Sequence, residues 1–223
     1  MVRDADVVVM AVPSHGFREV MHDAAPLVRP WVPVVSLTKG LERDSGKRMT
    51  EVVADELPGH PAAVLTGPNL AKEIMDGQPA ASVVAIDDDV IARELQRIFS
   101  NPRLLIYTNP DVVGCEVGGV VKNVIAIAAG MAAGMGFGDN TRATIITRGL
   151  AEMARLGAVL GGQPLTFAGL AGMGDLIATC SSQQSRNTQV GQALGRGEKI
   201  DDVLSAMKKI GRASCRERVY SNV

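Results

Sequence analysis

A single lysine interrupts a long apolar stretch in the middle of the chain. The segment VGGVVKNVIAIAAGM (117–131) contains only apolar residues and glycine apart from Lys122 and Asn123. On a helix that starts near Glu116, Lys122 would lie in the second turn, close to the positive end of the helix dipole, where a cation is unfavourable. Snorkelling of the side chain towards the helix end would explain the lysine without a function. We favour a functional lysine, because a buried amine can exchange a proton near neutral pH or bind an oxyanion.

A second group of polar residues follows in the segment GLAGMGDLIATCSSQQSRN (169–187). Asp175 comes after a glycine-rich approach and could orient a lysine and a substrate hydroxyl. Ser185, Arg186 and Asn187 offer a hydroxyl, a bidentate guanidinium and an amide, which together suit a phosphate group. Taken singly, Asp175 would be a helix cap and Arg186 a surface charge, so only the combination points to a ligand.

Three loops in the first half carry further candidates. The loops AVPSHGFR (11–18), SLTKGLE (36–42) and TGPNLAKEI (66–74) each follow a predicted strand. Ligands of open α/β sheets bind at the carboxyl ends of the strands. In the first loop, the backbone at Pro13 and Ser14 could face a cofactor, although an ordinary helix cap by Ser14 is the simpler interpretation.

The second and third loops also allow two interpretations each. Lys39 in the second loop could meet a phosphate, or it could be a solvated loop lysine. In the third loop, Gly67–Pro68 opens a predicted helix whose free N–H groups suit an anion, with a plain capped helix start as the default. Spacing alone leaves these alternatives open.

The elements that must position these residues change in type halfway along the chain. Apolar runs predict strands at 4–14, 32–38, 62–68, 80–86 and 103–107, with helices between them. After residue 107 only helices are predicted, at 116–134, 140–160, 173–180, 186–195 and 201–209. We therefore expect an α/β domain with a mostly parallel sheet at 1–114 and an all-helical domain at 115–209.

Composition excludes several classes of protein. The chain has 223 residues and a formal net charge of -1, which argues against nucleic acid or an anionic membrane as a partner. Three cysteines without a C-x-x-C pair, and no recognisable signal peptide, predict a cytoplasmic protein. The histidines have no ligand-spaced neighbours, so we expect no metal site. Residues 117–138 are long enough to span a bilayer, but an interior lysine costs about 3 kcal/mol, so we expect no membrane span.

Both ends of the sequence suggest a shortened chain. No G-x-G-x-x-G motif occurs anywhere in it. The last residues, IGRASCRERVYSNV (210–223), lose the apolar periodicity and resemble a translated sequencing adapter, so we expect a non-native tail. We expect that a fragment without a glycine-rich pyrophosphate loop has little or no activity of its own.

The motifs together resemble the bacterial NAD(P)-dependent glycerol-3-phosphate dehydrogenases. The matching pieces keep their order from residue 5 to about residue 200: VVMAVPS, SLTKGLE, LTGPNLAKEI, EVGGVVKNVIAIAAGM, GFGDNTRATIITRGLAEMARLG, GLAGMGDLIATC and QSRN. The resemblance implies a partial Rossmann-like domain, a partial helical substrate domain and an active site in the cleft between them. It also implies hydride transfer between NAD(P)H and dihydroxyacetone phosphate, which gives sn-glycerol 3-phosphate for glycerophospholipid synthesis.

Roles are carried over from the family residue by residue. Lys122 resembles the catalytic proton donor and acceptor, and Lys39 resembles the lysine that touches both cofactor and substrate. Asn69 stands where the family pattern leads us to expect a hydroxyl residue, which weakens that assignment. The implied substrate-binding set is Lys39, Gly67, Asn69, Asp175, Ser185, Arg186 and Asn187, and the cofactor-binding set is Pro13, Ser14, Lys39, Ala71 and Arg186.

Two other functions stay open on the sequence. A 3-hydroxyacid dehydrogenase of similar architecture also places a catalytic lysine on a helix after glycine. A non-catalytic dinucleotide-binding module would need no catalytic lysine at all. The sequence does not distinguish NADH from NADPH, and it leaves the oligomeric state open, with a homodimer as one option.

Overall fold

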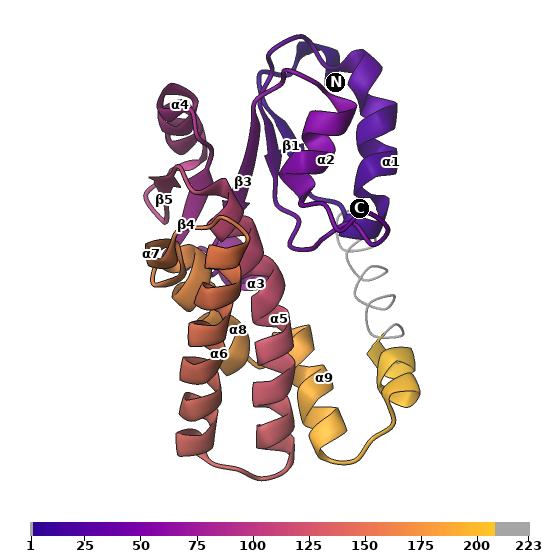
Figure 1. Ribbon diagram of the computed structural model, residues 1–223, viewed down its shortest axis with the longest axis vertical. Helices are drawn as coiled ribbons and strands as arrows, with labels where there is room; N and C mark the ends of the chain where they lie inside the picture. Colours follow the sequence, from indigo (N-terminus) through magenta and orange to yellow (C-terminus); the bar gives the residue numbers. More distant parts are fainter. Residues whose placement is uncertain (1, 208–223) are drawn as a thin grey trace.

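The computed structural model describes residues 2–207, which form an α/β part followed by a helical part (Figure 1). One five-stranded sheet runs through the α/β part in the order β1-β2-β3-β4-β5. Neighbouring strands are parallel except β3 and β4, which are antiparallel and pair Thr66 with Val83. The strands are β1 (Val8–Met10), β2 (Val34–Ser36), β3 (Ala62–Thr66), β4 (Ala80–Ala85) and β5 (Leu104–Asn109). The predicted α/β class with a mostly parallel sheet is confirmed.

Helices cover this sheet because their apolar faces bury against it. Phe17 of α1 and Met49 of α2 are fully buried with Val34 of β2 in one core cluster. In a second cluster, Leu95 of α4 packs with Ile106 of β5. The helical elements of this part are η1 (Val2–Asp4), α1 (Ser14–Ala24), η2 (Ala25–Leu27), α2 (Met49–Glu56), α3 (Ala71–Met75) and α4 (Asp89–Phe99).

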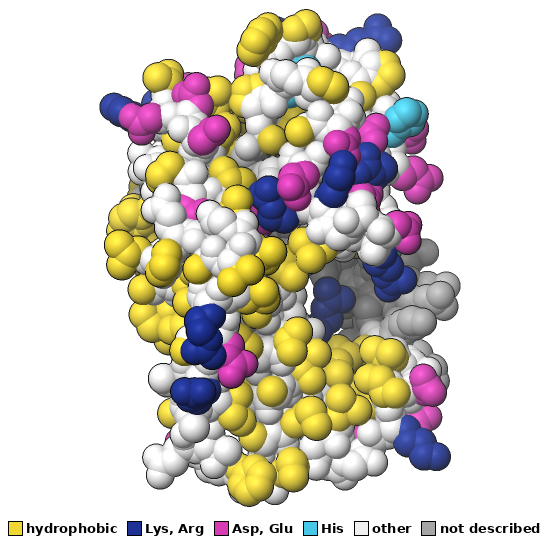
Figure 2. Space-filling model, viewed as in Figure 1, with side chains coloured by type: hydrophobic (Ala, Val, Ile, Leu, Met, Phe, Trp, Pro, Cys, Tyr) yellow, Lys and Arg dark blue, Asp and Glu magenta, His cyan; other side chains and the backbone are white. Residues whose placement is uncertain are grey.

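Charged side chains gather over α1, α2 and α4 on the face seen in Figure 2. Arg18 of α1 is the centre of one such group. Its guanidinium pairs with Glu42 at 2.6 Å, Asp55 at 2.9 Å and Glu56 at 2.7 Å, all within the α/β part. This ion-pair group ties α1 and α2 together and takes no part in the contact with the helical part.

Helix α5 is the axis of the helical part, and α6, α8 and α9 contact it along its length (Figure 1). The elements are α5 (Val112–Gly134), α6 (Asp139–Val159), α7 (Pro164–Phe167), the π-helical turn η3 (Leu170–Gly174), α8 (Asp175–Ser181) and α9 (Arg186–Gly195). Residues 200–207 are also helical.

The small-residue spacing of α5 serves contact with α9. A Cβ on Gly130 would lie 2.4 Å from the Thr188 carbonyl oxygen, and one on Gly191 would lie 2.1 Å from the Ile127 oxygen. Glycine therefore lets the two backbones touch, as in close helix pairs generally. By length and composition α5 could cross a membrane, but 56% of its most apolar window is buried inside the protein. We conclude that α5 is a core helix.

Two sequence-based expectations about element boundaries were wrong, and one element was not predicted. Helix α5 begins at Val112, because the Asp111 side chain accepts from the Gly114 N–H and caps the helix there. The predicted helix at Gly67–Pro68 begins only at Ala71. Gly67 instead has φ 133°, a conformation that favours glycine. The turn η3 was not foreseen.

Two further predictions concern the domain boundary and the end of the chain. The predicted domain boundary at residue 114 falls within the first turn of α5. The predicted non-native tail at 210–223 lies outside the described residues.

Candidate active site

Two lysines share one buried carboxylate at the junction of the two parts. Lys122 Nζ donates to Asp175 Oδ1 at 2.6 Å, and Lys39 Nζ donates to Asp175 Oδ2 at 2.7 Å. Asp175 is 2% exposed and Lys122 is 6% exposed. A buried charge is tolerated only when it is paired and hydrogen-bonded, and both carboxylate oxygens meet that condition here.

Glycines allow the three elements that carry this cluster to approach one another. Lys122 belongs to α5, Asp175 begins α8 after the π-helical turn η3, and Lys39 lies in the turn after β2. A Cβ on Gly118 of α5 would lie 2.7 Å from the carbonyl oxygen of Ala171 in η3. Substituting this glycine would therefore push η3, and Asp175 with it, away from Lys122.

The predicted position of Lys122 in the second turn of its helix was wrong. Because α5 begins at Val112, Lys122 lies about three turns into the helix, beyond the reach of the dipole at its start. The snorkelling alternative is also wrong, because the ammonium group ends on Asp175 and on Thr179 Oγ1, 2.8 Å away. Thus two N–H groups of Lys122 are used, and the third donates to no other described residue.

Lys39 is only 23% exposed at its side chain, so it is not a solvated loop lysine. Its ammonium also donates to the Gly67 carbonyl oxygen at 2.9 Å. Burial lowers the pKa of Lys39 to about 8; Asp175 opposes this shift and the nearby Lys122 ammonium adds to it. Its charge, and with it the attraction for an anion, therefore changes in the mildly alkaline range.

The loops after β1 and β2 lie side by side at the carboxyl edge of the sheet. Thr38 Oγ1 donates to the Val12 carbonyl oxygen at 2.6 Å and ties the two loops together. A Cβ on Gly40 would lie 2.8 Å from Ser14 Oγ. Pro13, not Ser14, occupies the N-cap position of α1, and no side chain caps that helix end. The Ser14 cap expected from the sequence is therefore wrong, and its hydroxyl faces the neighbouring loop.

The loop after β3 holds Asn69 and leads into α3. Ser82 Oγ of β4 donates a short hydrogen bond to Asn69 Oδ1, which fixes this amide beside the sheet. Ala71 is the first residue of α3. Thr66, the last residue of β3, has the one buried side-chain oxygen that lacks a hydrogen-bond partner within residues 2–207.

The Ser185-Arg186-Asn187 set is joined to the lysine cluster through neighbouring residues. Ser185 is the N-cap of α9 and accepts from the N–H of Thr188 at 3.3 Å. Asn187 Nδ2 donates to Asn123 Oδ1 at 2.8 Å, directly beside Lys122 in the chain. Arg186 is exposed and makes no side-chain hydrogen bond to another described residue, so its guanidinium is available to an anion.

The sequence did not identify Thr179 as a partner of Lys122, or Asn123 as a partner of Asn187. Besides accepting from Lys122, the Thr179 hydroxyl donates to the Asp175 carbonyl oxygen at 2.6 Å. This second bond orients the hydroxyl so that its lone pair faces the lysine. The four-residue spacing from Asp175 on one helix face could have pointed to Thr179.

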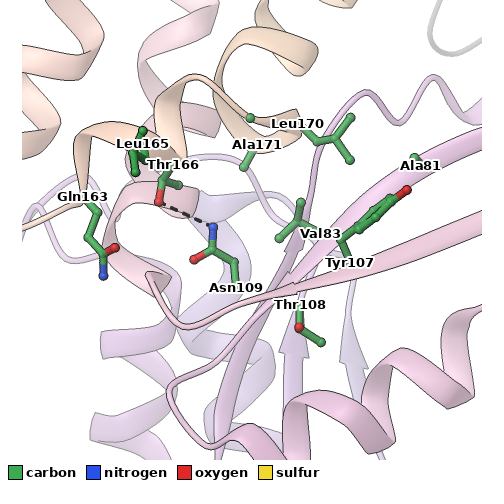
Figure 3. Close-up of a pocket in the computed structure, with 11 residues that line it drawn as sticks. Ala81, Val83, Tyr107, Thr108, Asn109, Gln163, Leu165, Thr166, Leu170 and Ala171 are labelled. Atoms are coloured by element: carbon green, nitrogen blue, oxygen red, sulfur yellow. Dashed lines mark hydrogen bonds between the residues drawn. The ribbon is translucent and has the colours of Figure 1, made fainter.

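A cavity of about 560 Å³ lies away from this cluster, between strands β4 and β5 and the segment of α7 and η3 (Figure 3). Its polar side chains are neutral; Asn109 and Thr166 point toward one another at 3.5 Å. None of the predicted site residues lines it. No cluster of potential metal ligands occurs within residues 2–207. The charged cluster around Asp175 is therefore the candidate active site.

Two models of one enzyme family match the chain, one in each half. Residues 1–92 match the model of the NAD-dependent glycerol-3-phosphate dehydrogenase N-terminus, and residues 111–219 match that of the C-terminus of the same enzymes. A glycerol-3-phosphate dehydrogenase (NAD(P)+) of Sphingopyxis alaskensis is 60% identical over 210 residues, which cover 94% of this chain and 63% of that protein. One from Mycobacterium avium is 53% identical over 206 residues, covering 92% of this chain and 60% of that protein.

A solved structure supports the same relationship. The crystal structure of glycerol-3-phosphate dehydrogenase from Coxiella burnetii superimposes with a TM-score of 0.87 at 40% identity, covering 91% of this chain and 62% of that one. The chain thus spans about 60% of the length of these relatives. Since both halves of the family are matched in order, the chain belongs to the NAD-dependent glycerol-3-phosphate dehydrogenase family.

Proposed function

We propose that this chain carries the substrate-binding and proton-transferring part of an NAD(P)-dependent glycerol-3-phosphate dehydrogenase. Such an enzyme interconverts dihydroxyacetone phosphate and sn-glycerol 3-phosphate, and we assign it to glycerophospholipid synthesis in the cytoplasm. The observation that carries the proposal is the pair of buried lysines on Asp175 at the carboxyl edge of the sheet. One lysine can serve the reacting oxygen while the other serves the phosphate.

Lys122 would transfer the proton. During reduction its free N–H donates to the carbonyl oxygen of the substrate, and the resulting neutral amine takes a proton back when the alcohol is oxidised. Asp175 and Thr179 hold the ammonium group in place, which preserves the geometry through this exchange. The nicotinamide cofactor supplies or accepts the hydride when it is bound.

The phosphate would be held by the cations and amides around this lysine. Lys39 and Arg186 provide positive charge, and Ser185 and Asn187 provide neutral donors. Gly67 and Asn69 would complete the substrate site from the loop after β3. The second lysine and the free guanidinium favour a phosphate ester over the carboxylate of a 3-hydroxyacid.

The residues at the sheet edge fit a dinucleotide. The bond between Thr38 and Val12 places two adjoining loops at the carboxyl ends of parallel strands, where dinucleotides bind in such folds. Pro13, Ser14, Lys39, Ala71 and Arg186 would contact the cofactor, which is either NADH or NADPH. We also propose a homodimer, which light scattering on the purified protein would detect.

The proposal is tested with this chain and with a chimera. In the chimera, the 210 matching residues of this chain replace their counterparts in the Sphingopyxis alaskensis relative, which supplies the rest of its own length. We expect the chimera to oxidise NADPH or NADH only when dihydroxyacetone phosphate is present. We expect this chain alone to bind sn-glycerol 3-phosphate in calorimetry but to show little turnover.

Substituting the lysine separates the candidate functions. In the chimera, Lys122→Met should lower turnover by about 10²-fold or more, because a general acid–base contributes that much. The matched control is Lys199→Met, an exposed lysine whose loss should leave turnover unchanged. Unchanged turnover in Lys122→Met would disprove its role. A preference for 3-hydroxyacids would favour the related dehydrogenase, and binding without any turnover in the chimera would favour a non-catalytic module.

A further inference from the structure

A second buried carboxylate lies at the junction of the two parts and takes no part in the proposed chemistry. Glu116, in the second turn of α5, is 6% exposed. Its Oε1 accepts from the N–H of Thr50 at 3.0 Å, and its Oε2 accepts from Thr50 Oγ1 at 2.6 Å and from Arg48 Nη1 at 2.8 Å. All three donors belong to the start of α2 in the α/β part. Glu116 therefore joins the two parts of the protein.

The position of this carboxylate is electrostatically favourable. Arg48 is the N-cap of α2 and Thr50 is its second residue, so the carboxylate sits at the positive end of that helix. Burial raises the pKa of Glu116, while the contacts with Thr50 and Arg48 oppose the shift. Removing one partner of such a buried group is strongly destabilising, because the other is left unpaired. Loss of either partner should therefore disturb the contact between α5 and α2.

Helix α5 connects Glu116 to the lysine cluster. Gly119 follows Glu116 by three residues and precedes Lys122 by three, so it neighbours both of them on adjacent turns of α5. A Cβ on Gly119 would lie 3.4 Å from Lys39 Cγ, which shows how closely α5 fits against the loop that carries this lysine. Any rotation or shift of the first turns of α5 would change this fit.

The hydrogen bond of Lys39 to Asp175 crosses the same junction. Lys39 belongs to the α/β part and Asp175 to the helical part, whereas Lys122 and Asp175 both belong to the helical part. The pairing of Lys122 with Asp175 can therefore survive a movement between the parts, but that of Lys39 cannot. A further contact between the two parts is therefore needed to keep both lysines on the carboxylate of Asp175.

We infer that Glu116 is a positioning residue, which locks α5 to α2 and thereby keeps Asp175 and Lys122 opposite Lys39. The inference rests on the proposed function only in taking the lysine cluster as the substrate site. The effect of Glu116 on the surroundings of Lys39 can be measured without substrate. The chain itself is therefore the right sample for the experiment.

The experiment follows the titration of Lys39 in protein labelled with 13C at the lysine Cε, with the signal assigned by Lys39→Arg. The test variants are Glu116→Gln, which keeps an acceptor for Thr50, and Glu116→Ala, which removes every contact. The matched control is Glu56→Gln: Glu56 also lies on α2 and accepts from an arginine, but within the α/β part. Urea unfolding of each variant gives its stability.

We expect the midpoint of Lys39 to move from about 8 towards 10.5, its value in water, in Glu116→Gln and further in Glu116→Ala. A loosened junction admits water around Lys39 and removes the burial that lowers its pKa. Affinity for sn-glycerol 3-phosphate, measured by calorimetry, should fall by about tenfold in Glu116→Ala, since residues that couple two sites typically act at this level. Glu56→Gln should lose stability but keep both the midpoint and the affinity.

The inference would be overturned if the titration midpoint of Lys39 were unchanged in Glu116→Gln while the variant lost stability as Glu56→Gln does. Glu116 would then be a purely structural group. If Glu116→Ala does not fold, the Glu116→Gln comparison still decides. A failure of the wild-type chain to bind sn-glycerol 3-phosphate would count against the proposed function alone, because the Lys39 titration needs no ligand.

Discussion

Replacing Asp175 by asparagine should destabilise the protein far more than the loss of an exposed carboxylate. The substitution keeps the size of the side chain but removes the negative charge that two ammonium groups share, at 2.6 and 2.7 Å. Lys39 and Lys122 would then face one another without a counter-ion. The carboxylate is nearly inaccessible to water, so solvent cannot take its place.

The size of the effect follows from this burial. Breaking a buried ion pair by removing one partner costs about 3–5 kcal/mol. Two like charges about 4 Å apart repel by a further ~4 kcal/mol at an effective dielectric constant of about 20, unless one of them loses its proton. Since the pKa of Lys39 is already about 8, deprotonation of Lys39 limits the total, and we expect about 3–5 kcal/mol at pH 7. For a chain of this size that corresponds to a fall in melting temperature of roughly 6–20 °C.

The pH dependence provides a second check. In the folded state the pKa of Lys39 lies below its unfolded value of 10.5, so the folded protein binds fewer protons and gains stability as pH rises between the two values. Without Asp175 the folded pKa falls further. The difference in unfolding free energy between wild type and Asp175→Asn should therefore be greatest at pH 6.5 and smaller at pH 9.5.

Urea unfolding followed by circular dichroism at both pH values measures these quantities. The matched control is Asp139→Asn, which removes an exposed carboxylate paired with Arg142 and should change stability far less. If Asp175→Asn were no more destabilising than Asp139→Asn, or if its deficit did not shrink at high pH, the electrostatic account of the site would be wrong.

The remaining predictions concern ligand binding, helix packing and backbone strain. Affinity for sn-glycerol 3-phosphate in calorimetry should fall as pH rises through about 8, because Lys39 loses its charge there; a flat profile would contradict this role. Gly191→Ala should lower the unfolding free energy by about 2 kcal/mol or more, because the new Cβ would lie 2.1 Å from the Ile127 oxygen. Gly16→Ala, on an open helix position, should raise it by about 0.5–1 kcal/mol. Trp31→Gly should raise it by up to about 1 kcal/mol, since Trp31 has φ 67° and is largely exposed; as the protein has one tryptophan, circular dichroism must serve as the probe.

The sequence by itself determined much of the architecture. Apolar runs located all five strands, and amphipathic or apolar periods located the long helices, because these periods depend only on local backbone geometry. The incompatibility of Lys122 with its apolar surroundings also pointed correctly to a buried lysine. Boundaries were less well predicted: Asp111 moved the start of α5 four residues earlier than expected by capping it.

Only the tertiary structure decided which side chains meet. Lys39 and Asp175 are 136 positions apart, and Lys122 and Asp175 are 53 apart. No local period links such residues. Their contact depends on how closely α5 approaches η3 and the loop after β2, and this distance is set by the missing side chains of Gly118 and Gly119. A sequence pattern can identify candidate charged residues. It cannot show that two lysines share one carboxylate, because this contact results from the packing of three elements that are remote in the chain.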